Sequence, residues 1–488
     1  MPLPFLHYRL EICAMLPAFR SSALHVLLIS SALTCTGVLA APAGSADAMS
    51  FSQARQQFHE RADVFRADAA DVERARHAAD SAKALSGPKV DLVAMQVEGR
   101  KDIELNLDIP QPISGMLHKN VLSYSTEYDL SGPRAMISAN WPIYTGGLIT
   151  AQQNLLEHKV REASAAQTSR LETKDAELAA RYWGVQLARS VEDLRREMLS
   201  DEEEEVQRAK RFEVKGMISK IERMSVEVSR DAARRELIAA ETNARVAESE
   251  LMRSLRLNKL PELATPLFIL KGDLGTLDDW QSRARLNSPV LMQIDAKRSQ
   301  AEEGVRAAEA AFHPQVFAFG MKNLVKHYLT VVEPDWMVGI GVKFTLWDNR
   351  DRFSNIAASR SQVTQAEAAR AEADNSLAQA IEAAFLRTTQ AREEFELTTS
   401  TMSLAAENLR LREASFAEGL STAIDLREAR TQLVGAEIAQ RAAAYKFVVS
   451  WAMLHATAGV MPDFEATLGR SDFVNAQQMH KTQASAKR

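Results

Sequence analysis

The residue types that could bind a metal or act as nucleophiles are poorly placed for either task in this chain. The ten histidines are scattered, and none lies at ligand spacing from another histidine or from a cysteine. The two cysteines, Cys13 and Cys35, both lie near the N-terminus. The sequence also lacks a phosphate-binding loop, a nucleophile elbow, an H-E-x-x-H helix and a dinucleotide-binding fingerprint. We therefore predict no catalytic residue, no metal site and no cofactor, and we do not expect an enzyme.

Composition excludes further classes of protein. With 488 residues, 46% of them hydrophobic and 25% charged, the chain is long enough for several domains and too apolar to be disordered. Only 20 glycines and 15 prolines punctuate it, which argues against a collagen-like or loop-rich all-β protein. The formal net charge is −5, whereas a general nucleic-acid binder would carry a basic surplus. We therefore predict no nucleic-acid partner.

An apolar stretch near the N-terminus predicts export from the cytoplasm. Residues 21–41 follow Arg20 and end in small residues, which is the pattern of a secretory signal peptide. An uncleaved membrane anchor of about 20 residues is the alternative. Cleavage would leave a mature chain without cysteine and therefore without disulfides. No later stretch is apolar enough for a transmembrane helix, so a membrane-embedded form would have to cross as β-strands.

Two halves of the chain superpose at one fixed offset of 203 residues, the separation of Trp141 and Phe344. The same offset aligns Leu178 with Ile381 and Gly216 with Gly419. One offset held over roughly 100 residues indicates a duplicated structural unit rather than a short-period solenoid. We predict a signal peptide over 1–41, a first repeat over 42–259, a linker over 260–275, a second repeat over 276–461 and a polar C-terminal tail over 462–488. The tail is expected to be disordered or loosely packed.

Each repeat has the same predicted elements in the same order. A helical stretch, over 50–86 or 276–312, is followed by two short strands and a very long helix. A turn with a glycine then leads into a second helix that returns. The long helix of the first repeat, over 147–212, lacks proline and would span about 98 Å at about 1.5 Å per residue. Globular domains rarely contain helices of this length.

The strands have the spacing of membrane strands. In the segment Met337–Leu346, apolar residues alternate with polar or small ones, and Trp336 and Trp347 bracket the run. The segment 135–143 alternates in the same way and ends near Trp141 and Tyr144. These four aromatic residues are predicted to lie at the membrane interface. The segments 90–97 and 315–321 are weaker partner strands. An amphipathic strand of a soluble protein is the alternative interpretation.

Four strands cannot close a barrel, and an open strand edge cannot lie in lipid. The strands would then have to be shared between chains, and three copies would supply twelve strands, an even number within the range of known membrane barrels.

With these elements in this order, the sequence resembles the TolC family of outer-membrane efflux channels. The resemblance covers nearly the whole mature chain and depends on the duplicated order of elements. Its other carriers are the segments WPIYTGGLI (141–149), FTLWDNRDR (344–352) and WAMLHATAG (451–459), and the turn segment around Phe416 and Gly419. It implies a mostly α-helical homotrimer with a small twelve-stranded β-barrel in outer-membrane lipid. A long α-helical barrel would continue this barrel through the periplasm.

The resemblance also implies functional positions. In the family, acidic residues just beyond the second turn close the periplasmic mouth, and the matching residues are Asp425 and Glu428. Their i, i+3 spacing places both on one helix face, so a trimer would have two acidic rings that favour cations. Glu222 is the equivalent of Asp425 in the first repeat. Ser421 stands where some members have a latching arginine, which puts a latch of that kind in doubt. A solvated helix face is the alternative interpretation.

The two turns are predicted to be the periplasmic tips that contact an adaptor protein. Gly216 and Gly419 would allow the tight reversal. Phe416 lies beside the second turn, and Lys215 and Lys220 make the first one basic. The acidic run 201–205 nearby is interpreted as a solvated face, or alternatively as a negative collar facing the lumen or the adaptor.

The function predicted from the sequence is a passive exit duct. It would carry small molecules from an inner-membrane pump and a periplasmic adaptor to the outside. The exit channel of a type I protein-secretion system is an alternative within the same family. A soluble periplasmic helical structural protein is an alternative from another class.

Overall fold

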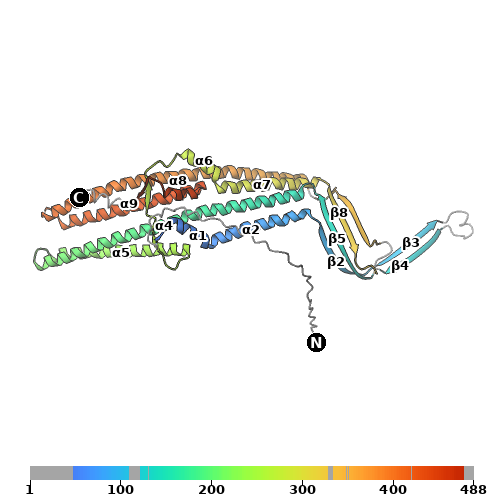
Figure 1. The fold of residues 1–488 in the computed structure, drawn as a ribbon, viewed down its shortest axis with the longest axis horizontal. Coiled ribbons are helices and arrows are strands. Elements are labelled where there is room, and N and C mark those ends of the chain that lie inside the picture. Colours follow the sequence, from blue (N-terminus) through green and yellow to red (C-terminus); the bar gives the residue numbers. More distant parts are fainter. Residues whose placement is uncertain are drawn as a thin grey trace, which may run out of the picture. The chain divides into compact units, whose positions relative to one another are not determined.

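The computed structural model describes residues 48–108, 121–129, 131–327, 333–347, 349, 351–418 and 420–476 (Figure 1). The predicted signal peptide over 1–41 and the turn residue Gly419 lie outside the described residues. Among the described residues, no helix is both long and apolar enough to cross a membrane.

Two helices dominate the structure. Helix α4 (Leu148–Val214) has 67 residues and helix α8 (Arg352–Ala417) has 66, so each is about 100 Å long at about 1.5 Å per residue. Helices α5 (Lys220–Leu255) and α9 (Ala423–Ala458) have 36 residues each, and they return along α4 and α8. The predicted long helices and return helices are confirmed, in the same order in both halves.

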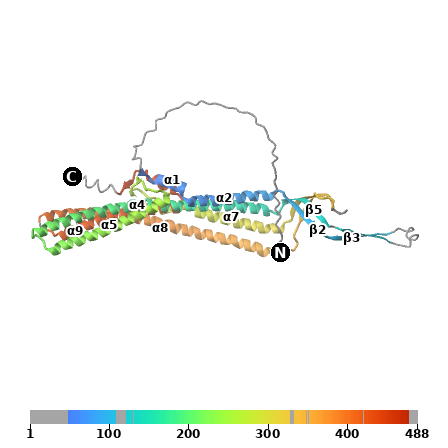
Figure 2. The same ribbon diagram turned by 90° about the horizontal axis from the view of Figure 1, so that it is seen from below.

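Shorter helices cover the remaining length of the long ones. Helix α2 (Asp63–Lys83) packs on α4, and helix α7 (Pro289–Glu309) packs on both α4 and α8 (Figure 2). The sequence predicted one helical stretch in each of these regions, and this is wrong in detail. Helix α1 (Phe51–Arg61) ends at Ala62, which has extended backbone angles, and helix α6 (Leu277–Asn287) ends in the same way at Ser288.

The core lies at the level where α1 is followed by α2 and where α6 is followed by α7. It is built on a cluster of fully buried aromatic residues, namely Phe51, Tyr182, Trp183, Phe268 and Phe464. Their rings meet mostly edge to face, with the centroids of Phe51 and Tyr182 5.6 Å apart. The indole Nε1 of Trp183 donates to the Pro266 carbonyl oxygen at 3.0 Å, which satisfies its polar group inside the cluster.

The segment after Met461 belongs to this core. Helix α10 (Met461–Thr467) places Phe464 in the aromatic cluster, and strand β10 (Phe473–Asn475) pairs antiparallel with β7 (Phe268–Leu270). The expected loose tail is therefore wrong for residues 462–476, because Phe464 supplies enough apolar surface to anchor them. Residues 477–488 lie outside the described residues. Strands β1 (Ala48–Met49) and β6 (Glu262–Leu263) form a second short pair.

The main sheet has four antiparallel strands in the order β2-β5-β8-β9. These are Lys89–Val97, Gly132–Tyr144, Gln315–Asn323 and Trp336–Lys343, so the two strands predicted for each repeat are confirmed. The sequence prediction missed strands β3 (Arg100–Asp108) and β4 (Val121–Asp129), which form a separate antiparallel pair. No strand or helix was predicted for this region.

Candidate functional site

The two helical turns share one geometry. Gly216 has a φ of 71°, and the Met217 N–H donates to the Phe212 carbonyl oxygen at 2.9 Å. At the equivalent place in the second turn, the Leu420 N–H donates to the Ser415 carbonyl oxygen at 2.8 Å. These bonds satisfy carbonyl groups that would be left unpaired where a helix ends. The left-handed conformation expected of Gly216 is therefore present.

Two of the three predicted acidic gate residues are part of helix caps. Glu222 accepts from the Ser219 N–H at 2.6 Å, and the Ser219 hydroxyl accepts from the Glu222 N–H at 3.2 Å. Asp425 forms the same reciprocal box with Thr422, accepting from its N–H at 3.0 Å and from its hydroxyl at 2.8 Å. These bonds, the backbone one first, lower the pKa of Asp425.

Glu428 differs from these two residues because it makes no cap. It is exposed on α9, one turn after Asp425. Asp425 is 39% exposed at its side chain, and the Arg412 guanidinium lies 4.0 Å from it. The structure therefore gives Asp425 and Glu222 a local structural role, whereas Glu428 has none that would compete with a role at the mouth.

A cavity of about 460 Å³ lies between the two helical hairpins near their turns. Its apolar wall includes Phe212, Ile218 and Phe416, so the predicted tip residue Phe416 contributes to this cavity. Its charged wall consists of residues from α4, α5 and α9, namely Glu202, Glu205, Glu222, Arg427 and Arg430.

Glu202 is the residue that the sequence interpretation placed wrongly. The acidic run 201–205 was interpreted as a solvated face, yet Glu202 is only 8% exposed. Its Oε2 atom is buried without a hydrogen-bond partner, and burial raises the pKa of this carboxyl group while Arg427 opposes the shift. The sequence carried a signal for this, because Glu202 shares a 3–4 spacing with the buried residues Val206 and Ala209.

The surface of the turns is more apolar than predicted. Lys215 and Lys220 are exposed, as a basic tip requires. Large apolar side chains beside them are exposed too, and the sequence prediction did not single them out. They are Val214, Met217 and Ile221 in the first turn and Leu420 and Ile424 in the second. Exposed apolar groups gathered at one place indicate a contact surface.

Two buried titratable groups lie near the core. Glu172 of α4 accepts from the Met461 N–H at 2.9 Å, and burial raises its pKa to about 7. His455 of α9 lies between the rings of Trp280 and Trp451, and burial lowers its pKa to about 4. Neither group approaches a candidate nucleophile. Among the described residues, no cluster of three or more His, Cys, Asp or Glu could hold a metal ion.

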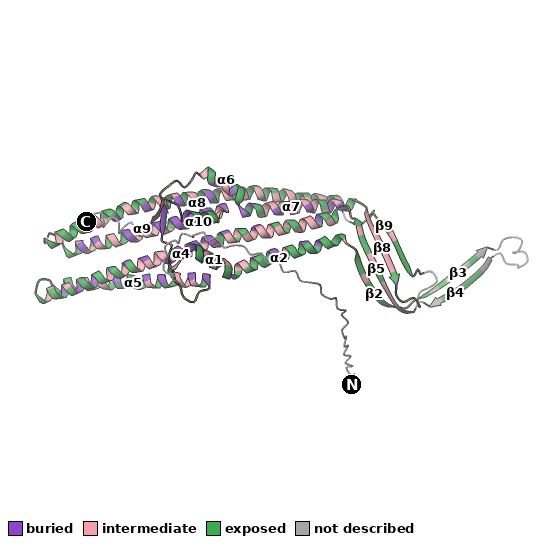
Figure 3. Ribbon diagram, in the orientation of Figure 1, coloured by how far each residue is buried: buried purple, intermediate pink, exposed green. Residues whose placement is uncertain are grey.

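One face of the main sheet is apolar and exposed. Strand register places Leu92 opposite Ile137, and Ala318 opposite both Trp141 and Ile340, on this face. Figure 3 shows exposed residues along β2, β5 and β9, whereas β8 is mostly of intermediate burial. We call this surface the outer face of the sheet. It includes Val90, Leu92, Ile137, Trp141, Val338, Ile340 and Val342.

Predicted interface aromatics lie at the ends of this sheet. Trp141, Tyr144, Trp336 and Trp347 are all exposed, as a lipid-interface role requires. The Trp141 Nε1 donates to the Ser86 carbonyl oxygen at 2.8 Å, and the Trp347 Nε1 donates to Asn349 at 2.6 Å.

The other face, which we call the inner face, explains two glycines in β9. A Cβ atom built on Gly341 would lie 2.6 Å from the ring of Phe317, and one built on Gly339 would lie 3.0 Å from the ring of Phe319. The glycines therefore leave space for two phenyl rings on the inner face, which also includes Lys89, Asp91 and Lys343.

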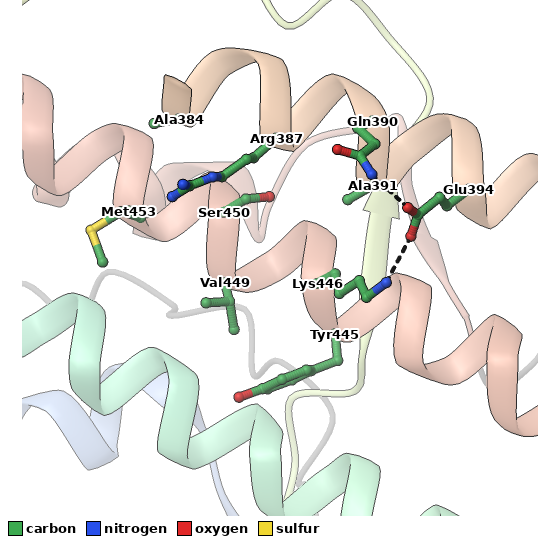
Figure 4. A pocket seen from close by; sticks show the side chains of 10 residues that line it. All are labelled: Ala384, Arg387, Gln390, Ala391, Glu394, Tyr445, Lys446, Val449, Ser450 and Met453. Atoms are coloured by element: carbon green, nitrogen blue, oxygen red, sulfur yellow. Dashed lines mark hydrogen bonds and ion pairs between the residues drawn. The ribbon is translucent and has the colours of Figure 1, made fainter. Parts of the chain in front are cut away.

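A groove of about 390 Å³ runs between α8 and α9 beside the core (Figure 4). The small residues Ala384 and Ala391 line it, and two of its charged groups are paired, since Glu394 accepts from Lys446 at 3.0 Å and also from Gln390 at 2.8 Å. Tyr445 donates to the Ala180 carbonyl oxygen at 3.3 Å. The groove holds no nucleophile beside a base, and its shape suits helix packing rather than catalysis.

The family of the chain follows from its sequence match. Residues 54–255 and 280–460 match the family described as outer membrane efflux protein. The chain belongs to this family. It is therefore an outer-membrane efflux channel protein that extends into the periplasm, and the alternative of a soluble structural protein is set aside. No curated protein matches the sequence significantly.

Solved structures share the fold of this outer membrane efflux protein at low sequence identity. A membrane protein from Pseudomonas aeruginosa matches at 15% identity and a TM-score of 0.69, covering 84% of this chain and 90% of its own. The Campylobacter jejuni CmeC outer membrane channel matches at 13% and 0.69, covering 84% and 86%. The open state of the Neisseria gonorrhoeae MtrE outer membrane channel matches at 17% and 0.66, covering 84% and 89%.

Proposed function

We propose that three copies of the chain form a passive exit duct for small molecules. An inner-membrane pump and a periplasmic adaptor would deliver the cargo and supply the energy. The chain itself would contribute a conduit through the periplasm and the outer membrane.

The observation that carries this proposal is the main sheet. Its outer face is apolar and exposed, and its edge strands β2 and β9 pair with no further strand among the described residues. An apolar sheet face suits lipid, but unpaired backbone groups cannot remain there. Pairing β2 of one copy with β9 of the next removes both free edges, and three copies give a closed sheet of twelve strands. The helices of about 100 Å would then continue the wall.

The turns are proposed as the entrance and the adaptor contact. Glu428 would supply an acidic ring, with Asp425 and Glu222 beside it as capping residues that also contribute charge. The adaptor would contact the exposed turn residues. The residues predicted from the sequence for this contact are Gly216, Gly419, Phe416, Lys215 and Lys220.

Native mass in separated membrane fractions tests the assembly. A species of three chains in the outer-membrane fraction, extracted with detergent, supports the shared sheet. A single chain in the soluble periplasmic fraction would overturn the proposal.

Single-channel conductance tests the entrance. We expect Glu428→Gln to reduce the preference for cations, because it removes three charges from one ring. Glu418→Gln is the matched control, since Glu418 is an exposed glutamate at the same turn. Equal effects of the two substitutions would contradict the assignment of Glu428.

Deletion of the gene separates small-molecule efflux from protein secretion. Greater sensitivity to small toxic compounds, with an unchanged set of secreted proteins, is the expected result. Loss of a secreted protein with unchanged sensitivity would favour the type I secretion alternative.

A further inference from the structure

The ribbon formed by β3 and β4 is the part of the structure that this proposed function leaves unexplained. The strands pair over nine residues each, from Arg100 opposite Asp129 to Asp108 opposite Val121. Among the described residues neither strand pairs with a third. A two-stranded ribbon is at best marginally stable in water, so it needs a surface to pack against.

The ribbon is a separate sheet that follows the main sheet after the same short interval on both strands. The last pair of β2 and β5 is Val97 with Gly132, and the first pair of β3 and β4 is Arg100 with Asp129. Two residues separate these pairs on each strand. With extended backbone through this interval, side chains alternate with a period of two, and each face of the ribbon would then continue one face of the sheet.

The outer face becomes polar toward this junction, where Gln96 is paired with Pro133. The outer face of the sheet, with Leu92 and Ile137, continues into a face with Asp102, Glu104 and Glu127, all exposed. Arg100 forms an ion pair with Glu127 on this second face. Charged groups are costly on a lipid-facing strand, so this acidic face must lie in water beyond the lipid.

The opposite face of the ribbon is more apolar. The inner face of β2, with Val93 and Met95 nearest the junction, leads to a ribbon face that includes Ile103, Tyr124 and Thr126. Ile103 pairs with Thr126, and Tyr124 is exposed in the single chain. In a closed sheet this face points toward the symmetry axis, where the same face of the other two copies also points.

We propose that the apolar faces of the three β3–β4 ribbons pack against one another on the axis, outside the membrane. The occupant of this face is the same face of a second and a third copy. This inference depends on the proposed trimer. The ribbons would form a bundle at the outward end of the duct, with apolar side chains inside and acidic ones in water.

Cysteine cross-linking of the full-length chain tests the packing. In a Cys13→Ser/Cys35→Ser background, every introduced cysteine is the single thiol of the chain. Ile103→Cys and Thr126→Cys report on the apolar face. Glu104→Cys and Ser125→Cys are matched controls, because these two residues pair with each other on the acidic face one position along. Each variant is treated with a short bis-maleimide in detergent, and its native mass is measured in parallel.

We expect the two apolar-face cysteines to give covalent species of two chains and the two controls to remain single chains. The native mass should be that of three chains throughout. A three-chain native mass with no cross-link on the apolar face, or with equal cross-linking on both faces, would overturn the inference and leave the trimer intact. A one-chain native mass in wild type would overturn the proposed function first and the inference with it.

Discussion

Helices α4 and α8 have nearly the same length and the same kind of turn, yet they occupy different environments. Helix α4 packs against α2, α5, α7 and α9, and it carries the fully buried Tyr182 and Trp183. Helix α8 packs against α6, α7 and α9 and leaves Leu386, Leu397, Leu404 and Leu411 exposed. The two repeats have therefore kept the same local geometry, but their long helices differ in how much of their surface is buried. One long helix forms the centre of the single chain, and the other borders a surface that a neighbouring copy can cover.

The largest difference in stability between the two long helices is expected at one pair of equivalent positions. Trp183 and Leu386 are separated by the repeat offset, but Trp183 is fully buried and Leu386 is 56% exposed. We expect Trp183→Ala to cost about 3–5 kcal/mol of unfolding free energy, since it leaves a cavity in the aromatic core. Leu386→Ala should cost less than about 1 kcal/mol in a dissociated chain. Denaturant unfolding of the dissociated chain measures both, and similar costs would remove the distinction between the two helices.

A buried acid gives the next largest effect. The pKa of Glu172 is about 7 in the fold and 4.5 as its ordinary value, so ionisation opposes folding. The contribution of protonated Glu172 to the free energy of unfolding is fully present below its unfolded pKa. This contribution is lost as the pH rises through about 7. Glu172→Gln should therefore stabilise the chain at pH 8 by up to about 3 kcal/mol and leave it nearly unchanged at pH 4. The second repeat has Asn375 at the equivalent position, so it has no such group there.

This prediction is checked by thermal unfolding across that pH range. Glu177→Gln serves as a partly exposed control on the same helix. If the wild type and Glu172→Gln lose stability in parallel as pH rises, Glu172 is not the group responsible.

Glu202 should show a smaller effect of the same sign. Its Oε2 has no partner, so Glu202→Gln should raise stability at neutral pH by roughly 1 kcal/mol. Glu203→Gln changes an exposed neighbour and should have almost no effect. The second repeat has Ala405 at the equivalent position, so this cost exists on one hairpin only. A destabilised Glu202→Gln variant would show that Glu202 and Arg427 already compensate each other.

The smallest predicted effects should be equal in the two repeats. Ser219→Ala and Thr422→Ala each remove one side of a capping box and should cost about 1 kcal/mol of local stability. Hydrogen exchange of the first turns of α5 and α9 measures this cost. Unequal losses would mean that the turns, too, have diverged.

Sequence reasoning predicted the elements that depend on local rules. Uninterrupted helical composition predicted α4 and α8, and alternation between two tryptophans predicted β9. It missed β3 and β4, although the segment from Asp102 to Asp108 alternates polar and apolar residues as a strand does. It also misjudged Glu202 and Phe464, because burial of a single side chain is decided by which helices meet around it. The acidic residues at the turns were found, but their capping bonds appear only once helix ends are known.

The breaks at Ala62 and Ser288 have a mechanical consequence. At this level the covering helices are interrupted, whereas α4 and α8 pass through without a break. The aromatic core around Trp183 is densely packed there, and the half of α4 nearer the turn is held by α5 and α9 with a cavity between the hairpins. The aromatic core therefore lies near the middle of each long helix. A bend of the helices at this level would displace the turns and leave the half that joins the sheet in place.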